Sequence, residues 1–326
     1  MKIFYNNQNK MKTIKEFIFL LCSAILVTAC DQVTYKKTPG GMPYQLFPGN
    51  SDKSIKVGDY VKLNLTQKIN DSLVFTSADK VPVYSRAIET PYPYDISELW
   101  TKLKKGDSVI ATQMMDTFIN RNPGNVPPQY KKGDRILTYV KILDVFETDS
   151  AYQADDTKEK ENRLKSDVAF MAKYIADKKI NAQRTPSGAY VEIIKPGQGP
   201  LIDSGKYVLI RYRGVSFSGK VFDTNMDSSF GKKEPYGFVE EVSTMIKGFT
   251  EGMKFLRKGA VAKFYIPSML GYGPQPNSAF IKPYEHIMFD IVVTDVLDKA
   301  PAPPVQTAPP QVADSMQKKK PVKKKN

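Results

Sequence analysis

Two long stretches of this chain, 54–148 and 185–298, carry the alternation of apolar and polar residues that marks β-strands. In the second stretch, Val208, Ile210 and Tyr212 occupy every other position, which is the side-chain period of a half-buried strand. The run 287–296 is similarly rich in β-branched residues. We therefore expect a sheet in each stretch.

A short helix is expected inside the second stretch. Four apolar side chains fall on one face of a 3.6-residue repeat: Ile246, Phe249, Met253 and Leu256. Gly259 follows at a position where a helix can end. The sequence thus predicts an α+β fold, with an antiparallel β-sheet wrapped on one short α-helix.

Residues 149–184, between the two stretches, have a different pattern. Apolar side chains recur there at steps of four, three and four: Leu164, Val168, Met171 and Ile175. This spacing predicts a helical linker with an apolar stripe that must be buried. The stripe either docks on the domain that follows or makes a homodimer contact, and the pattern leaves both alternatives open.

The two strand-rich stretches also correspond to each other. Three pairs of segments can be aligned: 58–77 with 205–224, 99–114 with 252–267, and 135–147 with 286–298. The offset stays near 150 residues, which indicates an internal duplication and not a short-period repeat. We therefore expect two related domains joined by the helical linker.

Composition and charge limit the possible partners. The chain has 326 residues, 41% of them hydrophobic, which is enough for about two domains. Part of its net charge of +14 sits at the C-terminus, where residues 299–326 hold seven lysines and one aspartate. The body is only mildly basic and carries no nucleic-acid motif, so no nucleic-acid partner is expected.

Histidine and cysteine are too rare for most catalytic or metal-binding centres. His286 is the single histidine, and the two cysteines are Cys22 and Cys30. This scarcity argues against a histidine metal site or a serine–histidine triad. We expect neither a metal nor a cofactor.

The N-terminus has the features of an export signal. Lysines precede an apolar run of eleven residues at 17–27, which is too short to span a bilayer but typical of a signal peptide. The motif VTAC that ends at Cys30 resembles the bacterial lipobox. This implies a lipoprotein signal peptide at 1–29 and a lipid anchor on Cys30. An uncleaved anchor or a plain signal peptide is the alternative, and Met11 could equally be the start.

Two further segments lack the composition of a packed core. Residues 30–53 contain Gly-Gly, Pro-Gly and Asn, and are expected to be a tether. Residues 299–326 are rich in proline and lysine and are expected to be a disordered tail. No acidic run follows Cys30. We therefore expect a cell-envelope protein on the periplasmic face of the outer membrane.

Seven short motifs occur in order in the second stretch: RYRG, VFDT, PYGF, MIKGFTEGMKFLRKG, IPSMLGYG, IKP and IMFDIVV. Together they resemble the FKBP-type peptidyl-prolyl cis-trans isomerases, strongly over 190–298 and weakly over 54–148. The resemblance implies two FKBP-like domains and isomerase activity for the second, with proline-containing polypeptides of exported proteins as substrates.

The resemblance also implies a pocket walled by aromatic side chains. Six residues would be catalytic: Tyr212, Phe222, Asp223, Phe249, Tyr272 and Phe289. Four more would bind substrate: Tyr236, Met245, Ile246 and Ile281. The Tyr272 hydroxyl and the Ile246 backbone N–H would donate to the substrate. Phe249 departs from the tryptophan of many members, and 274–280 differ from the familiar flap, which leaves macrolide binding and sequence preference open.

Such a residue set suits a reaction that needs no nucleophile and no proton acceptor. Rotation about an X–Pro bond crosses a barrier of roughly 18–20 kcal/mol because the amide is stabilised by resonance. The twisted transition state has lost this resonance and is less polar than the planar amide. A dry aromatic pocket therefore binds it preferentially, which is the requirement for catalysis.

The first stretch lacks the corresponding side chains. Leu65, Thr76 and Thr138 stand at three aligned pocket positions, and Phe118 or Ile119 takes the place of the tyrosine hydroxyl. We predict a degenerate FKBP-like domain without isomerase activity. The alternative function for the whole chain is an envelope chaperone or assembly factor whose isomerase activity is incidental.

Overall fold

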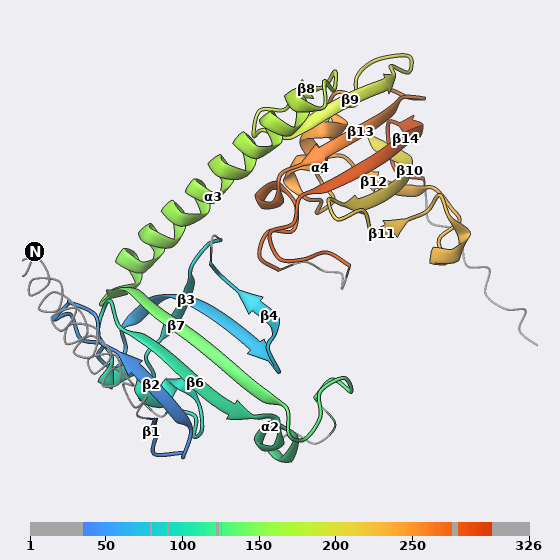
Figure 1. Ribbon diagram of the computed structural model, residues 1–326. Helices are drawn as coiled ribbons and strands as arrows, with labels where there is room; N and C mark the ends of the chain where they lie inside the picture. Colours follow the sequence, from blue (N-terminus) through green and yellow to red (C-terminus); the bar gives the residue numbers. More distant parts are fainter. Residues whose placement is uncertain are drawn as a thin grey trace, which may run out of the picture. The chain divides into compact units, whose positions relative to one another are not determined.

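The computed structural model describes residues 35–301, except 79, 90, 122–123, 125 and 276–279. The described chain divides into two compact units that meet between Arg163 and Leu164, and each contains one seven-stranded antiparallel sheet (Figure 1). The predicted α+β fold with two sheets and an intervening helix is confirmed. The signal peptide, Cys30 and the tail from 302 onward lie outside the described residues.

The first sheet has the strand order β1-β2-β6-β7-β3-β4, and β5 also pairs with β3. The strands are β1 (Lys36–Lys37), β2 (Pro43–Phe47), β3 (Tyr60–Ile69), β4 (Ser72–Thr76), β5 (Val83–Arg86), β6 (Ser108–Met114) and β7 (Arg135–Phe146). A 3-10 helix, η1 (Ile96–Lys102), and a short α-helix, α2 (Met115–Arg121), complete the unit. Asp95 and Glu98 form a capping box that fixes the start of η1.

Part of the expected tether is a strand of this sheet. Residues 43–47 form β2, which pairs with β6 so that Tyr44 lies opposite Ala111. Met42 and Tyr44 are buried in the first core. The tether prediction is therefore wrong for this part of 30–53. Its Gly-Gly signal belongs to the turn between β1 and β2, where Gly41 has a φ of +86°.

The second sheet has the order β11-β10-β14-β13-β9-β8, and β12 also pairs with β10. The strands are β8 (Gln183–Arg184), β9 (Tyr190–Lys195), β10 (Tyr207–Ser216), β11 (Val221–Thr224), β12 (Tyr236–Val239), β13 (Val261–Ile266) and β14 (Ile287–Leu297). Alternate residues of β10, including Val208, Ile210 and Tyr212, are buried, as the alternation predicts. The short helices are α4 (Lys247–Met253) and two 3-10 turns, η2 (Ser228–Phe230) and η3 (Ser268–Leu270).

Helix α4 packs against the second sheet (Figure 1). Phe249 and Met253 are buried in the core, and Gly252 lies so close to Phe264 that a Cβ there would stand 2.7 Å from its ring. Glycine thus allows the close approach of helix and strand. The helix is shorter than the apolar stripe suggests, because Ile246 is its N-cap and Leu256 lies beyond its end.

Helix α3 (Asp149–Asp177) is one continuous helix with contacts in both units. In the first unit, the ring of Tyr152 stacks on Tyr60 with 4.4 Å between ring centroids. In the second unit, Met171 and Ile175 are buried in a cluster with Tyr265. The buried part of the apolar stripe therefore docks on the sheet that follows it, which is the first of the two alternatives.

The two sheets have the same topology, strand by strand. The order β2-β6-β7-β3-β4 of the first matches β9-β13-β14-β10-β11 of the second, and β5 and β12 attach in the same way. This agreement supports the predicted internal duplication.

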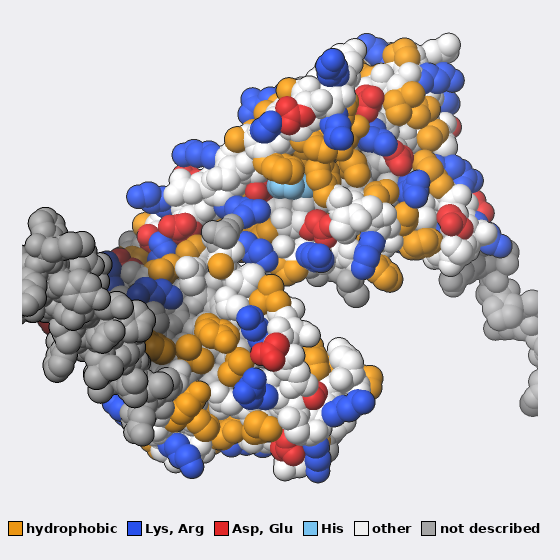
Figure 2. Space-filling model, viewed as in Figure 1, with side chains coloured by type: hydrophobic (Ala, Val, Ile, Leu, Met, Phe, Trp, Pro, Cys, Tyr) orange, Lys and Arg blue, Asp and Glu red, His pale blue; other side chains and the backbone are white. Residues whose placement is uncertain are grey.

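The described surface carries mixed charge. On the face in Figure 2, Lys and Arg side chains are interspersed with Asp and Glu. Within the part of the chain that the structure describes, no helix has both the length and the apolar character needed to cross a membrane.

Candidate functional site

A cavity of about 430 Å³ opens in the second unit, between β10, β11, β12, β14 and the start of α4. Its lining consists of Ile210, Tyr212, Asp223, Lys232, Tyr236, Thr244, Met245, Ile246, Phe249, Tyr272 and Phe289. Eight of the ten side chains that the sequence assigns to a site are among them. The other two, Phe222 and Ile281, are buried in the core cluster that includes the pocket aromatics.

Aromatic rings form the walls and the floor of the cavity. Phe289 on β14 meets Phe249 on α4 nearly edge to face, with 5.4 Å between ring centroids. Phe222 does not line the cavity, but its ring meets Phe289 at 5.6 Å and Tyr272 at 6.0 Å, both nearly perpendicular. Perpendicular aromatic pairs are a favourable packing geometry, so Phe222 supports two lining side chains from behind.

One wall is polar and carries three coupled groups. The Tyr212 hydroxyl donates to Asp223 Oδ2 at 2.8 Å, and Lys232 Nζ donates to Asp223 Oδ1 at 2.6 Å and to the Tyr212 oxygen at 3.2 Å. Burial and the bond to the Asp223 carboxylate raise the pKa of Tyr212 to about 12. The tyrosine therefore stays protonated at neutral pH. The bond to Asp223 likewise raises the pKa of Lys232.

A buried asparagine fixes the strand that carries this wall. Asn225 Oδ1 accepts the backbone N–H of Tyr212 at 2.7 Å. Its amide nitrogen donates to the carbonyl of Ile210 at 3.1 Å and to that of Glu234 at 3.0 Å. Asn225 thus ties β10 to the segment that precedes β12, so the two walls of the cavity keep their spacing.

Tyr272 lies on the loop after η3, as its flanking glycines predict. Gly273 has a φ of +57°, a conformation that glycine adopts without strain. A Cβ on Gly271 would stand only 3.1 Å from the Ile287 side chain. The two glycines therefore allow a tight loop on which Tyr272 lines the cavity while its ring rests against Phe222.

Ile246 lines the same cavity at the start of α4. It is the N-cap residue of this helix, with extended backbone angles. The first N–H groups of a helix have no intrahelical acceptor and can donate outward. This position is compatible with the expected donor role of the Ile246 backbone N–H.

Three lining residues were not predicted from the sequence: Ile210, Thr244 and Lys232. The alternation along β10 could have identified Ile210, because it shares a face with Tyr212. Lys232 lies between η2 and β12 in an irregular segment with no periodic pattern. Its contact with Asp223 depends on the tertiary fold.

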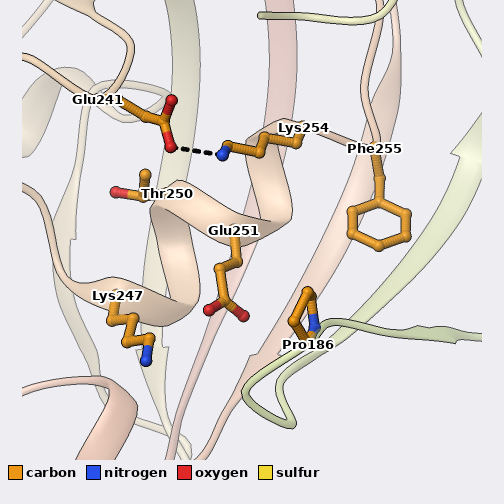
Figure 3. Close-up of a pocket in the computed structure, with 7 residues that line it drawn as sticks. All are labelled: Pro186, Glu241, Lys247, Thr250, Glu251, Lys254 and Phe255. Atoms are coloured by element: carbon orange, nitrogen blue, oxygen red, sulfur yellow. Dashed lines mark hydrogen bonds and ion pairs between the residues drawn. The ribbon is translucent and has the colours of Figure 1, made fainter. Parts of the chain in front are cut away.

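A second hollow, of about 500 Å³, lies on the exposed side of α4 (Figure 3). Three of its charged side chains have partners within the domain. Lys254 pairs with Glu241, and Glu251 accepts from the backbone N–H of Ser187 at 3.0 Å and from its hydroxyl at 2.6 Å. This hollow lacks the convergent aromatic rings of the first cavity, which is the better candidate site.

The residues that the structure describes contain no group of three or more His, Cys, Asp or Glu side chains arranged to hold a metal ion.

The described residues of the first unit carry other side chains at the aligned pocket positions. By strand register, Leu65 and Thr138 correspond to Tyr212 and Phe289, as the alignment predicts. The counterpart of Asp223 needs a correction. Asp223 lies opposite Gly214, and the equivalent residue of β4 is Phe75, one position before Thr76.

The loop that carries Tyr272 also has a different form in the first unit. Helix α2 follows directly after β6 there, and both Phe118 and Ile119 lie within this helix. The tyrosine loop of the second unit is thus replaced by regular structure.

Comparison with known proteins shows what the second domain is similar to. Residues 199–294 match the family model of the FKBP-type peptidyl-prolyl cis-trans isomerases, a range that contains all ten predicted pocket residues. The matched range covers the second sheet from β10 to most of β14, and strands β8 and β9 lie before it. The match does not include the first unit or helix α3.

The curated relatives point to the same class. A probable FKBP-type peptidyl-prolyl cis-trans isomerase of Haemophilus influenzae is 34% identical over 131 residues, which are 40% of this chain and 51% of the relative. FkpA of Escherichia coli, an FKBP-type peptidyl-prolyl cis-trans isomerase, is 28% identical over 183 residues, 55% of this chain and 63% of the relative.

A third relative is matched over more of its length. The outer membrane protein MIP of Legionella longbeachae is 29% identical over 219 residues, which are 62% of this chain and 89% of the relative. The chain thus spans between half and two thirds of the first two relatives and most of the third.

Proposed function

We propose that this protein is a peptidyl-prolyl cis-trans isomerase that accelerates X–Pro isomerisation in exported polypeptides, without a cofactor or a covalent intermediate. The observation that carries the proposal is the convergence of Tyr212, Phe249 and Phe289 with the Tyr272 side chain around one cavity. Proline-containing polypeptides are the substrate class of the family that residues 199–294 match.

In this proposal the proline ring enters between the aromatic side chains. The apolar surroundings favour the twisted imide, which is less polar than the planar ground state. The Tyr272 hydroxyl and the Ile246 N–H donate to substrate carbonyl oxygens and hold the chain across the cavity. Asp223 is already bonded to Tyr212 and Lys232, so its role is to keep the polar wall in place.

A protease-coupled assay on a proline tetrapeptide tests this function with the mature chain that begins at Cys30. We expect cis-to-trans conversion to be much faster than the uncatalysed reaction, which takes tens to hundreds of seconds. Conversion at the uncatalysed rate, in a sample whose folding is verified by circular dichroism, would reject the isomerase function.

We further propose that Cys30 carries a lipid anchor that holds the protein in the cell envelope, on the periplasmic face of the outer membrane. The lipobox-like motif VTAC supports this, and one relative is named an outer membrane protein. Cys30→Ser should move the protein out of the membrane fraction. A Cys30→Ser protein that is processed normally and stays on the membrane would contradict the anchor.

The first unit favours a second, complementary function, that of a chaperone-like contact with the substrate chain. It keeps the sheet of the second unit but has Leu65, Phe75 and Thr138 at the pocket positions. A second weak contact beside an active domain raises the local concentration of substrate. Deletion of the whole first sheet, residues 35–148, should therefore leave tetrapeptide turnover intact but slow proline-limited refolding of a whole protein. Equal refolding rates would favour docking to an envelope partner.

A further inference from the structure

A buried carboxylate on helix α3 is bonded to the loop that presents Tyr272. Asp167 is only 2% exposed, and its Oδ2 accepts both the hydroxyl of Ser268 and the backbone N–H of Met269, the latter at 3.2 Å. Ser268 is completely buried, at 0% exposure. Asp167 lies 32 residues before the start of the family match at 199, in a part of the chain that the match does not include.

Ser268 holds the backbone on both sides of Tyr272. Its carbonyl oxygen accepts the N–H of Gly271 at 3.0 Å and the N–H of Gly273 at 2.9 Å. Both neighbours of Tyr272 are therefore bonded to one residue. The direction of the tyrosine side chain follows from the backbone at 271–273, so it depends on where Ser268 lies.

Helix α3 supports Ser268 through a second group as well. The backbone N–H of Ser268 donates to Nδ1 of His286 at 3.0 Å. The His286 ring stacks on Phe170 of α3, with 4.6 Å between ring centroids and 16° between the planes. Helix α3 thus holds Ser268 directly through Asp167 and indirectly through Phe170, which stacks on the His286 ring.

A carboxylate at this buried position gives the loop hydrogen bonds that an apolar side chain could not give. Removing a charged side chain from water is costly, and an apolar residue of similar size is often equally or more stabilising. The neighbouring buried positions of the same helix, Met171 and Ile175, are apolar. Asp167 instead supplies two hydrogen bonds to adjacent residues of a loop whose geometry matters for Tyr272.

We propose that Asp167 is a positioning residue for the isomerase reaction, and that it acts through Ser268 to hold the Tyr272 hydroxyl over the cavity. This rests on the proposed function. It makes the second half of α3 part of the catalytic domain. The effect should be large because misplacing a reacting group by about 1 Å can cost up to roughly 100-fold in rate.

A double-mutant cycle on the full mature chain tests the proposal. Asp167→Ala should lower kcat/KM for a proline tetrapeptide about fivefold to tenfold. In the Tyr272→Phe background the same change should have less than about a twofold effect, because the hydroxyl that Asp167 positions is gone. Asp167→Asn, which retains a carbonyl acceptor for Ser268, should recover part of the loss. Ser166→Ala on the exposed side of α3 is the matched control and should keep wild-type activity.

A merely structural role predicts a different pattern. If Asp167→Ala only loosens the domain, it will lower kcat/KM by the same factor in the wild type and in the Tyr272→Phe background. This result would overturn the proposal. Wild-type activity with no loss in Asp167→Ala would overturn it too. An inactive wild type would instead reject the proposed function, which separates the two failures.

Hydrogen exchange gives a readout that does not depend on activity. The amides of Met269, Gly271 and Gly273 should exchange faster in Asp167→Ala, while amides of β10 and β14 keep wild-type protection. Unchanged exchange at 269–273 would contradict the positional link, whatever the kinetics show.

Discussion

The first and second sheets of this chain share one strand order, yet the side chains at the pocket positions differ in kind. Leu65 of the first sheet stands where the second has Tyr212, and Thr138 stands where it has Phe289. Both pairs keep the same cross-strand register. The comparison teaches that the apolar pattern is enough to specify this sheet, whereas the pocket depends on a few positions that can change without loss of the fold.

The hairpin next to the pocket differs between the two sheets by one residue in the length of its turn. In the first sheet, β3 and β4 are joined by a two-residue turn, Asn70 and Asp71, both with positive φ. In the second sheet the turn has three residues, 217–219, closed by the N–H of Ser216 on the carbonyl of Lys220. The shorter turn shifts β4 by one position, so Phe75, and not Thr76, corresponds to Asp223.

The two units also differ at one buried position beside the sheets. The backbone of Glu240 accepts the N–H of Gly205 and donates to the carbonyl of Lys206. The backbone of Ala87 makes the same two bonds in the first unit, with Gly58 and Asp59. Both are 1% exposed, but Glu240 Oε1 has no hydrogen-bond partner. Burial raises the pKa of Glu240 to about 7. The second unit thus carries a costly carboxyl where the first has a methyl group.

The largest expected effect comes from removing polar groups that line the cavity of the second unit. Asp223→Leu combined with Tyr272→Phe in the full chain should lower kcat/KM for a proline tetrapeptide by about 30-fold or more. Tyr272→Phe removes the proposed bond to the substrate and Asp223→Leu removes the bonds that hold the polar wall, and each loss is worth roughly 1–3 kcal/mol. The residual rate measures what the remaining aromatic lining contributes.

Stability measurements show whether a loss of activity in the double variant comes from a loss of folded protein. Unfolding of the double variant should stay near that of the wild type, since Lys232 and Asp223 are both partly exposed. Wild-type turnover in the folded double variant would mean that the site lies elsewhere, with the first unit the next candidate.

Much of this architecture was predictable from the sequence, for physical reasons that differ between regions. The alternation along β10 and the stripe at Met171 and Ile175 determine which faces are buried, so sheet and helix could both be predicted. The strand β2 was missed because turn signals at its ends dominate a five-residue strand. Lys232 could not be found, because its contact with Asp223 follows from tertiary packing alone.

A second, smaller effect should appear in the pH dependence of stability. The folded-state pKa of Glu240, about 7, lies above its ordinary value of 4.5. Between these values the folded chain binds more protons than the unfolded chain, so the free energy of unfolding falls as pH rises. Glu240→Gln should therefore stabilise the second unit at pH 8 by on the order of 2 kcal/mol, with little effect near pH 4.

The neighbouring carboxyl provides a control of opposite sign. The bond to Lys254 lowers the pKa of the exposed Glu241, so Glu241→Gln should not stabilise the protein at pH 8. Denaturant unfolding can be followed by circular dichroism for the whole chain. Trp100, the single tryptophan, reports the first unit by fluorescence. Wild-type and Glu240→Gln transitions that coincide at pH 8 would argue against an ionised buried carboxyl.

The smallest expected effect concerns the two hairpin turns. Asp71 has a φ of +66°, which disfavours any residue but glycine or asparagine in a two-residue turn of this kind. Asp71→Gly relieves this strain but increases the entropy of the unfolded chain, and it gives up an exposed 3.8 Å contact with Arg135 that contributes little. The net result should be a stabilisation of the first unit by about 0.5 kcal/mol.

The matched change in the second hairpin should act in the opposite direction. Gly219 has a φ of +88°, so Gly219→Ala should destabilise the second unit by about 1 kcal/mol. The fluorescence transition of Trp100 should move to higher denaturant in Asp71→Gly and stay in place in Gly219→Ala. Tetrapeptide turnover should be unchanged by Asp71→Gly, because the first hairpin carries no pocket group. A loss of turnover in that variant would show that the first unit takes part in catalysis, and the contrast between the two sheets would then have to be abandoned.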